Sequence, residues 1–249
     1  MNELNIPELE PSTETAIGYS TCYRLPFLSL FHADCMEIMK QYPDKYFDLA
    51  IVDPPYGIGE SNKQRKNAPC KRWKAAKNDI PYEKKEWDKT IPTAEYWQEL
   101  FRVSKNQIVW GGNYMTEYLP PRMGWIFWDK KNGDTDFSDG ELAWTSFNKA
   151  LRKFEWMWSG FKKQRPEERI HPTQKPVALY AWILKNYAKQ GDKILDTHFG
   201  SGSIALAVDK ANRLDKMNLH LTACEIDKEY IDKAIKRISE SIKQGTLSF

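Results

Sequence analysis

The sequence predicts an α/β fold with a doubly wound, mostly parallel sheet, and three observations support this prediction. A nearly continuous apolar run at Phe47–Val52 is typical of a strand buried on both faces. A second short strand at 193–196 leads through a glycine turn into a helical segment. Strand and helix patterns then alternate to the end of the chain. This alternation indicates parallel strands with helices on both faces of the sheet.

The N-terminal half begins with a helix and several strands. Asp34 can cap a helix at 34–41, with Glu37 as its capping-box partner. The strand at 47–52 must end where Asp53-Pro54-Pro55-Tyr56 begins, because two prolines cannot continue a central strand. Further strand patterns follow at 107–110, 125–128, 142–146 and 154–158.

The C-terminal half alternates helices with strands. A helix is expected at 177–189, where Pro176 stands at its start and Gly191 follows its end. The strand at 193–196 precedes a helix at 203–211, and another strand ends at Glu225. Asp227 can cap a final amphipathic helix.

Length and composition indicate one globular domain without a membrane anchor. A chain of 249 residues can bury a full α/β core. We expect a polar arm at 1–22 and a single domain at 23–249, with a basic insertion at 57–95. No apolar run approaches the roughly 20 residues that span a bilayer. The acidic, polar N-terminus does not look like a targeting peptide.

Cysteine usage predicts neither a metal site nor a disulfide framework. The chain has four cysteines, and they form no CxxC pair. We therefore expect no bound metal and a location in the reducing cytoplasm.

The glycine turn at 199–202 is a candidate cofactor site. It follows Asp196 at a strand end and opens a helix, so a ligand can approach the backbone there. Glu225 stands 25 positions after Gly200, near the spacing of a ribose-binding carboxylate. The pattern alone fits NAD, FAD, S-adenosylmethionine or a tight turn. The missing third glycine (Ala205 stands there) and the lack of a following lysine favour an adenosyl group over a pyrophosphate.

Asp53-Pro54-Pro55-Tyr56 is a candidate catalytic site. An exocyclic amine on a nucleobase is a poor nucleophile, because its lone pair is delocalised into the ring. The Asp53 carboxylate and the Pro54 carbonyl could both accept N–H bonds from such an amine and free the lone pair. The two prolines fix the backbone, and the face of Tyr56 offers a stacking surface for an extruded base. The alternative is a strand-ending turn with a surface tyrosine.

A basic segment follows this motif. Between Ser61 and Lys89 there are ten Lys and Arg against four acidic residues, although the net charge of the whole chain is only +3. Concentrated positive charge is typical of proteins that bind a polyanion, and a solvated lysine-rich loop is the alternative. The candidate DNA-binding residues are Lys63, Arg65, Lys66, Lys71, Arg72 and Lys74.

Taken together, the motifs resemble the amino-group DNA methyltransferases of the permuted, β-class arrangement, in which the DPPY motif precedes the cofactor motif. The resemblance extends from about Leu30 to Ile238 and includes 110–114, 125–130 and His171-Pro172-Thr173-Gln174-Lys175-Pro176. It implies a Rossmann-like methyltransferase sheet in circularly permuted order, S-adenosylmethionine as cofactor and double-stranded DNA as partner. The implied reaction is methyl transfer to N6 of a flipped adenine. N4 of cytosine and a catalytically silent DNA-binding relative remain alternatives.

The resemblance also implies roles for individual residues. Asp34 would face the cofactor adenine, and Glu225 would bind its ribose. Thr173 and Lys175 would lie near the methionine carboxylate. The methionine loop would comprise Asp196, Phe199, Gly200, Ser201 and Gly202, and the catalytic residues would be Asp53, Pro54, Pro55 and Tyr56. A homodimer is one candidate assembly.

Two departures from the family pattern and two rival activities bear on this interpretation. Thr197-His198 stands where the family usually has a proline after the motif aspartate. The recognition segment at 147–170 is short, so we expect modest sequence readout, or readout by Ser61–Lys89 and Lys149–Arg169.

A cytosine-C5 enzyme would use a Pro-Cys nucleophile, but Pro69-Cys70 lies in the lysine-rich stretch. RNA and protein amide methyltransferases use similar proline-rich motifs, but the permuted order favours DNA.

Overall fold

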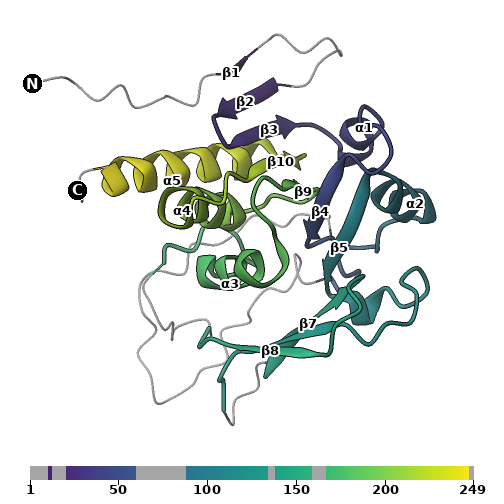
Figure 1. The fold of residues 1–249 in the computed structure, drawn as a ribbon. Helices are drawn as coiled ribbons and strands as arrows, with labels where there is room; N and C mark the ends of the chain where they lie inside the picture. The colour runs from purple at the N-terminus through teal and green to yellow at the C-terminus, as the bar shows by residue number, and fades with distance from the viewer. Residues whose placement is uncertain (1–10, 13–20, 60–87, 134–137, 159–166, 247–249) are drawn as a thin grey trace, which may run out of the picture.

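The computed structural model describes residues 11–12, 21–59, 88–133, 138–158 and 167–246, and these residues build one large twisted sheet covered by helices (Figure 1). The strand order is β1-β2-β3-β10-β9-β4-β5-β7-β6-β8. The strands comprise β1 (Pro11–Ser12), β2 (Thr21–Leu25), β3 (Leu28–His32), β4 (Phe47–Val52), β5 (Ser104–Trp110), β6 (Trp125–Asp129), β7 (Gly140–Thr145), β8 (Arg152–Glu155), β9 (Lys193–Asp196) and β10 (His220–Glu225).

The centre of the sheet is parallel. Strands β3, β10, β9, β4 and β5 pair in parallel, whereas β2 pairs antiparallel with β3 and β7 antiparallel with β5 and β6. The helices are α1 (Cys35–Met39), α2 (Ala94–Val103), α3 (Val177–Tyr187), α4 (Ser203–Asp215) and α5 (Lys228–Thr246), with a 3₁₀ turn, η2, at Gly112–Tyr114. The predicted α/β class with a mostly parallel sheet is confirmed.

Alternating side chains of the central strands explain why both faces of the sheet are covered. Leu49 and Ile51 of β4 belong to a core that α3, α4 and α5 cover, whereas Ala50 and Val52 belong to a core shared with α2. Figure 1 shows α3, α4 and α5 on one side of the sheet and α1 and α2 on the other. A continuous apolar strand is therefore necessary at this position.

The predicted elements are largely confirmed, with shifted ends. Strands β4 and β9 have the predicted bounds, and α4 runs four residues beyond the predicted end at Ala211. The strand predicted at 154–158 is wrong in position, because β8 occupies 152–155 beside β6. Helix α3 ends at Tyr187, before the predicted end at Lys189, since Ala188 has an extended backbone.

Two parts of the fold were not predicted. The β2–β3 hairpin extends the sheet beyond β10, and Pro11 and Ser12 of the predicted arm pair with β2 at its edge. Helix α2 begins at Ala94, so the predicted insertion at 57–95 overlaps its first residues. Its apolar face (Tyr96, Trp97, Leu100 and Val103) is buried against the sheet.

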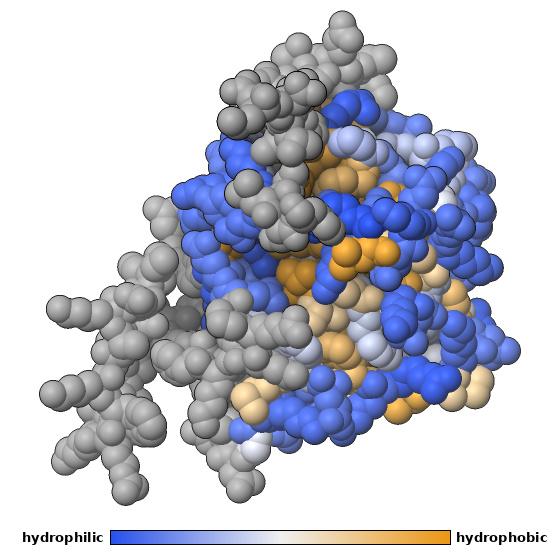
Figure 2. All heavy atoms as spheres, turned by 60° about the vertical axis from the view of Figure 1, so that its left-hand side comes forward, coloured by the Kyte–Doolittle hydropathy of each residue, from blue (hydrophilic) through white to orange (hydrophobic). Residues whose placement is uncertain are grey.

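The surface of the described part of the chain carries both hydrophobic and hydrophilic residues. On the face drawn in Figure 2, hydrophobic residues gather in the middle and hydrophilic residues surround them. None of the helices in the described ranges is both long enough and apolar enough to cross a membrane.

Candidate active site

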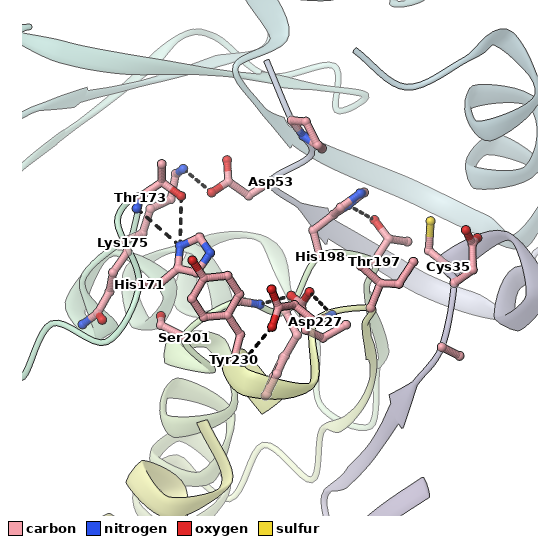
Figure 3. A pocket seen from close by; sticks show the side chains of 18 of the residues that line it. Cys35, Asp53, His171, Thr173, Lys175, Thr197, His198, Ser201, Asp227 and Tyr230 are labelled. Carbon is pink, nitrogen blue, oxygen red and sulfur yellow. Dashed lines mark hydrogen bonds and ion pairs between the residues drawn. The ribbon is translucent and has the colours of Figure 1, made fainter. Parts of the chain in front are cut away.

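A cavity of about 550 Å³ lies at the carboxyl ends of β3, β4, β9 and β10 (Figure 3). The parallel pairing of these strands brings their ends to one edge of the sheet, where open α/β sheets bind ligands. Nine of the predicted site residues line the cavity: Asp34, Asp53, Pro55, Thr173, Lys175, Phe199, Gly200, Ser201 and Glu225. Of the predicted residues that the structure describes, Pro54, Tyr56, Asp196 and Gly202 are not part of this lining.

The glycine turn holds Glu225 at the cavity wall. The Gly200 N–H donates to Glu225 Oε2 at 2.8 Å, and the Asp227 N–H donates to Oε1 at 3.0 Å. Gly202 has a φ of +70°, and a Cβ there would lie 3.1 Å from the Phe199 ring, so this position favours glycine. A carboxylate offers about four lone-pair sites. The backbone N–H groups leave acceptor capacity on Glu225 toward the cavity, which suits a ligand with hydroxyl groups.

Asp196 lies behind this lining. Its side chain is buried at the end of β9, and its Oδ1 accepts a hydrogen bond from the His198 N–H at 3.0 Å. Burial raises the pKa of Asp196 to about 8, and the nearby carboxylates of Asp53 and Glu225 add to the rise. The raised pKa favours the protonated, uncharged form of this carboxyl, which acts as a structural group beneath the turn.

Asp53 is held by two donors at the end of β4. The Tyr56 hydroxyl donates to Asp53 Oδ1 at 2.7 Å, and the Lys175 ammonium donates to Oδ2 at 2.5 Å. The resemblance implied that Lys175 lies near a methionine carboxylate, but the structure places its ammonium on Asp53. One lone-pair site on each oxygen of Asp53 is left for another donor.

The contact between Asp53 and Lys175 belongs to a series of alternating charges. Lys175 Nζ lies 3.2 Å from Glu141 Oε2, and Lys130 Nζ lies 2.6 Å from Glu141 Oε1. Burial opposes the charge of Glu141, but Lys175 and Lys130 outweigh it and lower the pKa of Glu141 to about 2. Burial also raises the pKa of Asp53 above its ordinary value, although the charge of Lys175 opposes the rise. The pKa of Lys175 is raised, because its two carboxylate neighbours outweigh its burial.

Three residues outside the predicted site fix the loop that carries Tyr56. Asp88 accepts hydrogen bonds from the Tyr56 and Gly57 N–H groups at 2.8 and 3.0 Å. A Cβ at Gly111 would lie 2.2 Å from the Tyr56 ring, so only glycine fits beneath it. Tyr114 stacks on Tyr56 with 5.2 Å between ring centroids and an interplanar angle of 17°. The glycine pair at 111–112 directly after a strand was the one sequence signal of this contact.

The remaining predicted residues divide into two groups. Asp34 caps α1 by accepting the Met36 N–H at 2.7 Å, and Thr173 contacts His171 through its hydroxyl at 3.1 Å. The six predicted DNA-binding residues lie outside the described residues: Lys63, Arg65, Lys66, Lys71, Arg72 and Lys74. Sequence reasoning missed several residues of the lining, including Cys35, His171, Tyr180, Thr197, His198, Asp227 and Tyr230.

Comparisons with known proteins agree on one family. The family model for N6/N4 methyltransferases, described as DNA methylase, matches residues 105–236. The chain is 23% identical to the type II methyltransferase M.ScaI of Streptomyces caespitosus, over 87% of this chain and 83% of the relative. It is 27% identical to the type II methyltransferase M.HinfI of Haemophilus influenzae, over 85% of this chain and 68% of the relative.

One solved structure has a similar fold. It is the PvuII DNA methyltransferase, described as cytosine-N4-specific, with a TM-score of 0.51 and 12% identity. The match covers 88% of this chain and 90% of that structure. At this identity the likeness concerns the fold, which is Rossmann-like.

Replacement of Asp196 by Asn should remove a pH dependence of folding stability. The folded chain keeps a proton that the unfolded chain releases above the ordinary pKa of 3.8. The stabilising contribution is therefore full below about pH 4 and declines toward about pH 8, by at most about 1.4 kcal/mol per pH unit. Denaturant unfolding of the wild type and Asp196→Asn across this window measures the difference. The variant should gain relative stability as the pH rises, and parallel curves would show that Asp196 is ionised in the folded protein.

Proposed function

Because this chain belongs to the N6/N4 DNA methylase family, we propose that it methylates the exocyclic N6 of an adenine flipped out of double-stranded DNA. The chain is an amino-group DNA methyltransferase, and S-adenosylmethionine is its methyl donor. The choice of adenine belongs to the proposal, since the exocyclic amine of cytosine has the same chemistry. The observation that supports methyl transfer to an exocyclic amine is that Asp53 and Glu225 line one cavity.

The cavity fits the cofactor. Its volume of about 550 Å³ lies within the range of small-molecule sites. The free acceptor positions of Glu225 would take the two ribose hydroxyls, Asp34 would face the adenine, and the turn at Phe199–Gly202 and Thr173 would lie along the methionine part. When bound, S-adenosylmethionine supplies a methyl group on a positively charged sulfur. The methyl group is transferred readily, because the rest of the cofactor leaves as a neutral thioether.

Asp53 would act on the target amine. Its unoccupied lone pairs and the Pro54 carbonyl would accept the two N–H bonds, which pulls the nitrogen toward tetrahedral geometry and makes its lone pair available. Burial raises the pKa of Asp53, so the carboxylate is a stronger acceptor than an exposed one. After transfer the nitrogen must lose one proton, and Asp53 is the nearest acceptor in this arrangement. Lys175 and Tyr56 would keep the carboxylate in place.

Tyr56 would provide the stacking surface for the base. Its hydroxyl is fixed on Asp53 and its ring is seated over Gly111, so its plane is defined before substrate arrives. Such preorganisation avoids an entropic cost at the moment of reaction.

The order of the motifs along the chain, Asp53 before the glycine turn, supports the permuted arrangement that the sequence suggested.

Asp53→Ala should lower the rate of methyl transfer by about 10²–10³-fold, the usual cost of losing a transition-state acceptor. Cofactor affinity should fall much less than the rate, because none of the contacts proposed for the cofactor is made by Asp53 itself. A radiolabelled methyl-transfer assay and titration calorimetry with S-adenosylhomocysteine measure the two quantities.

The alanine variant also leaves Lys175 without one partner, so a second variant is needed. Asp53→Asn keeps the shape of the side chain and should remain folded, while transfer is still strongly reduced. Circular dichroism checks the fold of both variants. Transfer at the wild-type rate by either folded variant would show that Asp53 has no catalytic role.

The basic segment at Ser61–Lys89 would bind the phosphate backbone of DNA. Replacing Lys71, Arg72 and Lys74 with Ala should weaken binding to all duplexes alike. It should also flatten the dependence of log affinity on log salt, by about 0.9 for each phosphate that the variant no longer neutralises. Fluorescence anisotropy at several salt concentrations measures this slope. An unchanged slope would mean that these charges face solvent, and a weakening confined to one DNA sequence would mean that they read bases.

A further inference from the structure

His198 is a polar residue of the cofactor cavity that the family pattern does not explain. It is the second residue after β9, next to Thr197, which stands where the family usually has a proline, and it is half-buried and lines the cavity. Figure 3 shows His198 beside Thr197 and Cys35, at the end of the cavity away from Thr173. Asp34, next to Cys35, lines the same cavity and lies near enough for its charge to affect the His198 ring.

A chain of hydrogen bonds fixes the orientation of this ring. The Tyr96 hydroxyl lies 2.7 Å from Thr197 Oγ1, and Thr197 Oγ1 lies 2.9 Å from His198 Nδ1. Tyr96 also contacts the His198 ring edge to face, with 5.7 Å between centroids. The ring therefore has little freedom to turn, and its second nitrogen, Nε2, is the one left for a ligand.

With the Tyr96 phenol as its first donor, the same chain of hydrogen bonds selects one tautomer of His198. Tyr96 is buried in α2, and burial raises the pKa of its phenol well above the ordinary value, so the phenol keeps its proton. In the contact between that phenol and Thr197 either oxygen can be the donor, and we take the phenol as the donor to Thr197 Oγ1. The single proton of the threonine hydroxyl then goes to His198 Nδ1. Burial lowers the pKa of His198 to about 4, so the neutral ring carries its proton on Nε2.

Asp34 presents the opposite kind of group. Its Oδ1 accepts the Met36 N–H, which fixes the carboxylate at the start of α1 and leaves Oδ2 as an acceptor. A donor and an acceptor thus lie at one end of the cavity. This pair complements the edge of an adenine ring, where an acceptor ring nitrogen adjoins the donor amine.

We propose that His198 selects the adenine ring of the cofactor by donating its Nε2–H to a ring nitrogen, while Asp34 accepts the exocyclic amine. Tyr96 and Thr197 are positioning residues that keep His198 in the donor tautomer. This inference rests on the proposed function and assigns to His198 a recognition role. An analogue of the cofactor with inosine in place of adenosine would place a carbonyl oxygen against the Asp34 carboxylate, so its binding is disfavoured.

Titration calorimetry with S-adenosylhomocysteine and S-inosylhomocysteine tests the proposal. The wild type should bind the adenosyl compound more tightly. His198→Phe removes the donor but keeps a ring of similar size, and it should weaken adenosyl binding by roughly 3–10-fold, the usual effect of removing one hydrogen bond. The variant should lose less affinity for the inosyl compound, so the preference for the adenosyl over the inosyl compound should be smaller than in the wild type. An equal weakening for both compounds would mean that His198 only packs against the ring.

Matched variants separate this effect from general damage to the site. Glu225→Gln removes a proposed hydrogen bond to the ribose, which both compounds share, and should weaken both alike. His198→Gln retains an N–H donor and should preserve more of the selectivity than His198→Phe. If the wild type binds neither compound, the proposed function is wrong. If it binds both with a ratio that His198→Phe leaves unchanged, only the role of His198 is wrong.

Nitrogen-15 NMR of the wild-type imidazoles tests the tautomer of His198 directly. The chain has four histidines, so the His198 signal can be assigned with the Phe variant. The spectrum should show Nδ1 without a proton and Nε2 with one, and Tyr96→Phe should mix the two tautomers. Nδ1 protonation in the wild type would overturn the proposal.

Discussion

The buried ion pair between Asp53 and Lys175 is the interaction on which the site depends. The two residues are 122 positions apart, and their side chains are 18% and 3% exposed. Burying either charge alone would cost several kcal/mol, so each requires the other in place. The pair ties the end of β4 to the segment before α3 and thereby closes one wall of the cavity. Glu141 of β7 pairs with Lys175 and with Lys130, which follows β6, so the charges of the pair are balanced further by residues of the antiparallel part of the sheet.

The same edge of the sheet combines two kinds of carboxyl group with different chemistry. Glu225 is fixed by backbone N–H groups and keeps free acceptor positions, which suits a neutral polyhydroxyl ligand. Asp53 is fixed by an ammonium and a phenol, which suits a group that must receive an N–H bond and then a proton. Asp196 ends β9, which lies between β10 and β4, and its burial raises its pKa and disfavours a third charge there. The burial of each carboxyl group therefore decides its role as much as its residue type does.

Sequence alone predicted the parts of the fold that depend on local patterns. Strand β4 has both faces buried, so its apolar run marked both of its ends. Helix α2 has an equally regular apolar face but follows the charged segment, and no helix was predicted there, while its first two residues fell within the predicted insertion at 57–95. The partners of Asp53 could not be predicted in the same way. Glu141 and Asp88 reach the site through tertiary packing alone, and the contact of Lys175 with Asp53 joins distant segments.

The most direct measurement is identification of the methylated base. Double-stranded DNA is incubated with the wild-type protein and methyl-labelled S-adenosylmethionine, digested to nucleosides and separated by chromatography with mass detection. We expect the label in N6-methyldeoxyadenosine. Label in N4-methyldeoxycytidine would keep the chemistry of the Asp53 site and change its target base. Label in 5-methyldeoxycytidine would contradict the central claim that Asp53 acts on an exocyclic amine.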